Sequence, residues 1–92
     1  MAKKTVHYNQ SGTAELPQDK PVVYRIKTNA GQTNYVGVAK RGRARERIQE
    51  HLSAGEIPGA KVEIEQKSSI QEARKTEIRA IARSKPKYNK QG

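Results

Sequence analysis

The apolar residues of this chain gather in short periodic runs that begin after residue 20. Residues 22–27 and 33–39 are rich in β-branched side chains and tyrosine, and the turn-forming sequence Asn29-Ala30-Gly31 lies between them, so the two runs predict a β-hairpin. Residues 60–65 alternate strictly between apolar and polar side chains. This alternation predicts a third strand with one face exposed to solvent.

A different periodicity follows the predicted hairpin. Ala44, Ile48 and Leu52 recur at i,i+4 spacing, which indicates a helix over residues 44–52 with a narrow apolar stripe on one face. Glycine readily adopts the left-handed conformation that closes many helices. We therefore expect this helix to end at Gly55.

Residues 70–83 predict a second helix. Ser69 precedes the segment as a suitable N-cap, Glu72 lies near the positive end of the helix dipole, and Pro86 prevents continuation beyond the end. The predicted order is β-β-α-β-α. It corresponds to an α+β fold with a small three-stranded antiparallel sheet flanked by helices.

The first 20 residues differ from the remainder. They are polar and contain turn-forming residues, with few apolar side chains to anchor them to a core. We therefore expect residues 1–20 to form a polar N-terminal arm and residues 21–92 to form the folded domain. A chain of 92 residues has room for one such domain.

The amino-acid composition excludes several kinds of catalytic and metal-binding site. The chain contains no cysteine, which excludes disulfides, thiolate zinc sites and cysteine nucleophiles. Its first residues lack the apolar core of a signal peptide, and no apolar run is long enough to cross a bilayer. We therefore expect a cytoplasmic location and chemistry that depends on oxygen and nitrogen groups.

The net charge points to a polyanionic partner. The 19 Lys and Arg residues against nine Asp and Glu residues give a formal charge of +10, which favours nucleic acid. A membrane surface is disfavoured because neither predicted helix opposes its charges with bulky apolar residues. The residues expected to contact phosphates are Lys40, Arg41, Arg43, Arg45, Lys85, Lys87 and Lys90. A merely solvated run of charges remains the alternative.

Glu77 is the most informative single residue. On a helical wheel it falls between Ile70 and Ile81 and beside Ala73 and Ala80, in the middle of the apolar arc. An ionised carboxylate in that position needs a cation, a metal ion or a hydrogen-bond donor to compensate it. A structural salt bridge to an arginine of the helix is the alternative to a functional role.

Two further pairs carry potential chemistry. Arg47 and His51 project from one helical face at i,i+4 spacing, where they could both meet one phosphate or remain ordinary surface residues. Tyr24 and Tyr35 lie on the two arms of the predicted hairpin. Periodicity alone leaves open whether the two phenols share a face of the sheet, and tyrosine in a strand is often a core residue.

Taken together, these residues resemble the GIY-YIG nuclease superfamily over residues 21–89. The matching segments, in order, are Val22-Val23-Tyr24, Tyr35-Val36-Gly37, Arg47 with His51, Glu77 and Pro86-Lys87-Tyr88-Asn89. The chain departs from the family at two positions. Val22 replaces a glycine, and Val38 stands where some members carry a lysine, for which Lys40 is the nearest basic substitute.

The resemblance implies a metal-dependent endonuclease that hydrolyses phosphodiester bonds in DNA. In such an enzyme Tyr24 would act as or assist the general base, and Tyr35 would hold the nucleophile or the phosphate. The remaining implied roles are charge stabilisation by Arg47, orientation of the site by His51 and Asn89, and binding of Mg²⁺ or Mn²⁺ by Glu77.

Two other functions remain open at this stage. One is a catalytically weak or inert nucleic-acid-binding module that retains the GIY-YIG fold. The other is a small basic protein associated with RNA or the ribosome, for which the resemblance would be accidental. In the GIY-YIG superfamily, substrate preference often comes from additional domains, so a partner protein that supplies specificity is a further expectation.

Overall fold

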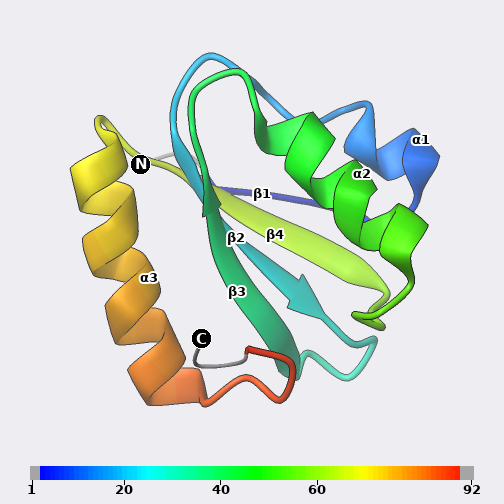
Figure 1. The fold of residues 1–92 in the computed structure, drawn as a ribbon. Helices are drawn as coiled ribbons and strands as arrows, with labels where there is room; N and C mark the ends of the chain where they lie inside the picture. Colours follow the sequence, from blue (N-terminus) through cyan, green and yellow to red (C-terminus); the bar gives the residue numbers. More distant parts are fainter. Residues whose placement is uncertain (1–2, 90–92) are drawn as a thin grey trace.

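The computed structural model describes residues 3–89 and contains seven elements. In chain order they are β1 (Lys3–His7), α1 (Gln10–Thr13), β2 (Val22–Lys27), β3 (Thr33–Ala39), α2 (Ala44–Ala54), β4 (Lys61–Gln66) and α3 (Ile70–Ser84). The strands form one antiparallel sheet in the order β1-β4-β2-β3 (Figure 1). None of the helices within residues 3–89 has the length and apolar character required to span a membrane.

The predicted α+β class and antiparallel pairing are confirmed, but the prediction of three strands was wrong. The fourth strand, β1, comes from the N-terminal segment expected to be a polar arm, and it pairs with β4 so that Val6 lies opposite Val62. Val6 and Leu16 are buried in the core. A short edge strand that turns a single apolar side chain inward leaves no detectable alternation in the sequence, which explains the error.

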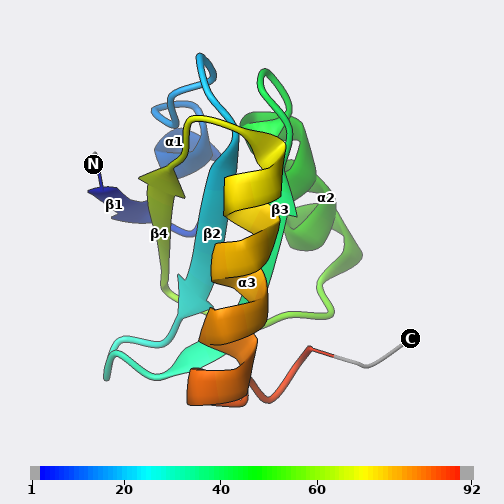
Figure 2. The same cartoon turned by 90° about the vertical axis from the view of Figure 1, so that its left-hand side faces the viewer.

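The sheet forms the middle layer of the molecule (Figure 2). On one face, Tyr24, Ile26 and Ile64 pack with Ala44 and Ile48 of α2, while Leu52, the third residue of the predicted stripe, is half-buried. The fully buried side chain of Ile48 packs α2 against the sheet. Gly55, in the left-handed conformation at φ 67°, ends α2 as expected.

On the opposite face, α3 lies across β2 and β3. Ala73 and Ala80 of α3 pack with Val23 and Val36 of the strands, and small residues on the helix allow close approach to the sheet. The side chain of Ser69 caps the first turn by accepting a hydrogen bond from the Glu72 backbone N–H, at 3.2 Å. Strand β3 is an edge strand, so α2 and α3 flank this edge from opposite sides.

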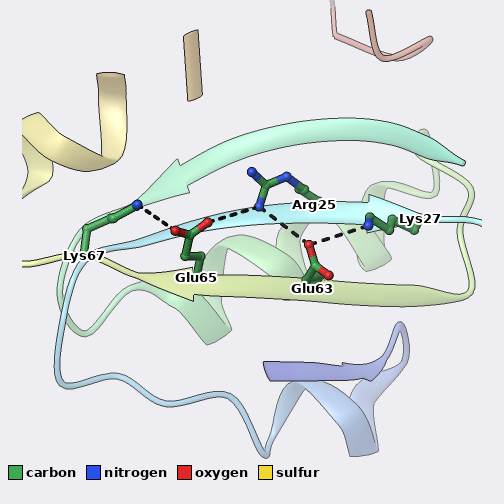
Figure 3. A network of polar contacts seen from close by, with 5 residues as sticks. All are labelled: Arg25, Lys27, Glu63, Glu65 and Lys67. Carbon is green, nitrogen blue, oxygen red and sulfur yellow. Dashed lines mark hydrogen bonds and ion pairs between the residues drawn. The ribbon is translucent and has the colours of Figure 1, made fainter. Parts of the chain in front are cut away.

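A network of charges crosses β2 and β4 on the α3 side of the sheet (Figure 3). Arg25 Nη1 lies 3.7 Å from Glu63 Oε1 and 3.6 Å from Glu65 Oε1, and Lys27 Nζ lies 3.5 Å from Glu63 Oε1. Lys67 Nζ donates to Glu65 Oε2 at 2.7 Å and thereby lowers the pKa of Glu65. The network pairs both carboxylates and keeps the buried Glu65 ionised, so part of the positive charge serves the fold.

Candidate active site

The strand register settles the position of the two phenols. Tyr24 lies opposite Gly37, and Ile26 lies opposite Tyr35, so both tyrosines project from the sheet face that α2 covers. Their ring centroids are 6.0 Å apart with the planes inclined at 29°. The hairpin therefore brings together two hydroxyl-bearing rings whose relation periodicity left open.

Tyr24 and His51 form the polar centre of this cluster. The Tyr24 hydroxyl lies 2.8 Å from His51 Nε2, and the His51 ring also packs against Tyr35 with centroids 4.8 Å apart. Tyr24 is fully buried, whereas His51 is half-buried. His51 is thus part of a side-chain network rather than a solvated surface residue.

The protonation of this pair follows from its surroundings. Burial raises the pKa of Tyr24 well above its ordinary value, with Tyr35 adding to the effect and Arg47 opposing it. Burial, followed by the charge of Arg47, lowers the pKa of His51. At neutral pH both groups are therefore uncharged. We assign the imidazole proton to Nδ1, and in that tautomer the phenol donates and Nε2 accepts.

Gly37 provides the space that the tyrosine pair occupies. A Cβ at this position would lie 2.5 Å from the Tyr24 hydroxyl oxygen and 3.0 Å from Tyr35 Cε2. Because Tyr24 is fully enclosed by the core, its ring has little room to move away. The glycine of the second motif is therefore required by packing against both phenols.

We expect Gly37→Ala to cost about 1–3 kcal/mol of unfolding free energy, since the added methyl overpacks the core. Displacement of Tyr24 would also expose His51 and raise its pKa toward the ordinary value. Urea unfolding and an NMR titration of His51 measure the two effects. Val38→Ala, whose side chain lies on the other face of β3, is the comparison, and an unaltered His51 pKa in Gly37→Ala would contradict the assignment.

Arg47 links the tyrosine cluster to a surface hollow. Its positive charge opposes the rise in the pKa of Tyr24, and its guanidinium forms an exposed salt bridge with Glu50 at 3.2 Å. The predicted alternative, a surface pair with a glutamate, is therefore present alongside the electrostatic effect on Tyr24. The hollow has a volume of about 320 Å³ and is lined by Val38, Ala39, Lys40, Arg43, Arg47, Ile70 and Arg74.

Glu77 lies on α3, across the edge strand from the tyrosines, and is half-buried. Burial raises its pKa, which the positive charge of Arg74 partly counteracts. Arg74 also lines the hollow that Arg47 borders. The hollow is therefore lined from both helices, with Arg47 from α2 near the phenols and Arg74 from α3 near the carboxylate.

The C-terminal segment covers the exposed backbone of the edge strand. Asn89 Oδ1 accepts a hydrogen bond from the Val36 backbone N–H at 2.7 Å, and Asn89 Nδ2 donates to the Val36 carbonyl at 2.8 Å. The Tyr88 backbone N–H donates to the Asn34 carbonyl at 2.8 Å. Asn89 thus holds β3 in place, and β3 carries Tyr35 and Gly37.

The predicted basic residues differ in their surroundings. Lys40 and Arg43 line the hollow, while Arg41 is exposed beside them. Arg45 contacts the N-terminal segment, because its Nε donates to the Leu16 carbonyl at 3.0 Å. Lys85 follows the last turn of α3 with φ 46°, and Lys87 Nζ lies 5.8 Å from the Tyr88 ring centroid. Neither residue lines the hollow. Lys90 lies outside the described residues.

Arg74 is the residue that sequence inspection missed. It is exposed and one of many arginines, so composition gave no reason to select it. Its spacing of three residues from Glu77 was the available signal, because residues at i,i+3 are neighbours on a helix. Among residues 3–89, no three His, Asp or Glu side chains gather as a ready metal cage.

Comparisons with known proteins find chains of similar fold among solved structures. No protein-family profile and no curated protein matches the chain. A crystal structure of the GIY-YIG N-terminal endonuclease domain of UvrC from Thermotoga maritima, bound to magnesium as its catalytic divalent cation, is 26% identical with a TM-score of 0.69. The match covers 88% of this chain and 96% of that one. A tyrosine-to-phenylalanine mutant of the same domain is 25% identical with a TM-score of 0.69, over 89% and 96% of the two chains.

Proposed function

Because this chain has the fold of the GIY-YIG superfamily, we propose that it is a divalent-metal-dependent endonuclease acting on DNA. The observation that carries the proposal is the arrangement around edge strand β3. It comprises a phenol–imidazole pair, a basic hollow lined by Arg47 and Arg74, and a half-buried carboxylate at Glu77. Hydrolysis of a phosphodiester needs these three functions, namely proton removal from water, binding of the phosphate and a site for a cation.

The Tyr24–His51 pair supplies the proton path in this proposal. A buried phenol with a raised pKa is a poor base alone, but when a water molecule reaches its oxygen, that oxygen can take a proton from the water while the phenol's own proton passes to His51 Nε2. The lowered pKa of His51 keeps Nε2 free to accept that proton at neutral pH. His51 thus becomes the proton acceptor, and Tyr24 transmits the proton and orients the water.

Glu77 fits a role as the metal ligand. Its carboxylate has lost part of its hydration, as the raised pKa indicates, so a bound cation would compensate it. A single protein carboxylate is compatible with Mg²⁺, which keeps most of its coordination shell as water. A bound Mg²⁺ or Mn²⁺ would supply Lewis acidity at the phosphate and stabilise the leaving oxygen.

Arg47 and Tyr35 complete the proposed substrate contacts. Arg47 borders both Tyr24 and the hollow, where its guanidinium would bind a non-bridging phosphate oxygen and stabilise the charge that develops there. Tyr35 packs on His51 and would help to hold the attacking water or the phosphate. Asn89 acts through β3 as a positioning residue.

The test is cleavage of supercoiled plasmid and branched DNA by the purified protein. We expect nicking with Mg²⁺ or Mn²⁺ and none with EDTA, while a gel-shift assay shows binding in all three conditions because the net charge of +10 does not depend on the metal. Binding without cleavage of any substrate would instead identify an inert module of the same fold. The choice of DNA over RNA, a specificity partner and a cytoplasmic location belong to the same proposal.

A further inference from the structure

The hollow at the edge of the sheet contains positive charge from two different helices. Of its seven described lining residues, four are basic and none is acidic, the basic ones being Lys40, Arg43, Arg47 and Arg74. Arg43 and Arg47 belong to the start of α2, whereas Arg74 belongs to α3 on the other side of β3. Val38 and Ala39 supply a neutral strand surface between them.

The four cations are not equally available. Arg43 and Arg47 each form a salt bridge with a glutamate of their own helix, Glu46 and Glu50 respectively. Arg74 takes part in no salt bridge and no side-chain hydrogen bond within residues 3–89. It therefore has all its guanidinium donors available for an incoming anion.

A guanidinium that lines this hollow is suited to binding a phosphate group. The donors of arginine form a planar fork that matches two oxygens of a phosphate group. Arg47 faces the same hollow from the opposite wall, so a phosphate there would be held from both sides of β3. The neutral Val38 offers no charge, and Arg74 supplies the cation that α3 contributes to the hollow.

We propose that Arg74 is a phosphate-binding residue, which together with Arg47 clamps one phosphodiester group of the nucleic acid backbone in this hollow. The inference rests on the proposed function for its substrate class, but the binding site itself is testable without cleavage. Arg74 lies three residues before Glu77, on the neighbouring turn of α3. The clamped phosphate would consequently lie beside the carboxylate proposed to bind the metal.

The first experiment measures binding of inorganic phosphate by NMR, without metal, to wild type, Arg74→Ala, Arg74→Lys and Lys75→Ala. Lys75 is the next residue, is equally exposed and does not line the hollow, so it controls for loss of one positive charge. We expect Arg74→Ala to weaken phosphate binding about ten-fold or more, because a charge-assisted hydrogen bond is lost. Arg74→Lys should recover part of the affinity, and Lys75→Ala should resemble wild type.

The second experiment repeats the comparison with plasmid cleavage. If wild type cleaves DNA, Arg74→Ala should lose activity about ten-fold more than Lys75→Ala does. Arg74-dependent phosphate binding by a protein that never cleaves would support the clamp and overturn the endonuclease proposal. Equal effects of Arg74→Ala and Lys75→Ala in both assays would overturn the clamp, whatever the cleavage activity. Circular dichroism confirms that the exposed substitution leaves the fold intact.

Discussion

Replacing Glu77 by glutamine should reduce metal-dependent cleavage about a thousand-fold or more while leaving DNA binding nearly unchanged. Glutamine keeps the shape of the side chain but loses the charge that a divalent cation requires. Because Glu77 is half-buried and its pKa is raised, its neutral replacement should fold as well as wild type or better. Plasmid nicking, gel shift and thermal unfolding measure the three effects.

The matched control for this substitution is Glu72→Gln. Glu72 lies on the same helix but is exposed, and its side chain accepts a hydrogen bond from the Ser68 backbone N–H, which glutamine can still do. We expect this variant to cleave like wild type. A Glu77→Gln protein that retains full Mg²⁺-dependent activity would remove Glu77 from the metal site.

Tyr24→Phe is expected to reduce cleavage by about a hundred- to ten-thousand-fold, the range associated with loss of proton transfer to a positioned group. The substitution removes the hydroxyl that lies 2.8 Å from His51 Nε2 and leaves the ring in place. Since one hydrogen bond to a half-buried partner is lost, the cost in unfolding free energy should be only about 0.5–1.5 kcal/mol. Single-turnover cleavage and urea unfolding separate the two quantities.

Tyr8→Phe is the comparison for Tyr24→Phe. Tyr8 packs against the same core cluster but lies outside the phenol–imidazole pair, and its hydroxyl has no hydrogen-bond partner within the described residues. The Tyr8→Phe variant should therefore cleave DNA at the wild-type rate. Comparable activity losses in the two variants would mean that Tyr24 acts only through packing.

The elements of residues 22–84 were predictable because their side chains follow clear periods. β2 and β3 begin and end where the apolar pattern does, and α2, β4 and α3 differ from the predicted ranges by one or two residues at an end. Helix termini are specified locally, by Ser69 at the start of α3 and Gly55 at the end of α2. Helix-capping residues of this kind can be identified from the sequence without knowledge of tertiary contacts.

The N-terminal segment was not predictable in the same way. β1 buries one of its five side chains, and its place in the sheet depends on β4, which lies more than 50 residues later in the chain. Leu16 is fully buried because the segment folds back over the sheet, although the residues around it show no apolar periodicity. Pairing between distant segments leaves little trace in a polar edge strand.

By itself, the sequence determined the α+β class, the hairpin, the two principal helices and the set of residue types that a phosphodiesterase needs. Tertiary structure decided which of those residues meet. It placed both phenols on one face, paired Tyr24 with His51, and added Arg74 to the hollow that Arg47 lines. The reason is physical: periodicity specifies which side of an element is buried, whereas sheet register and the packing of α2 and α3 around an edge strand specify distances between residues remote in the chain.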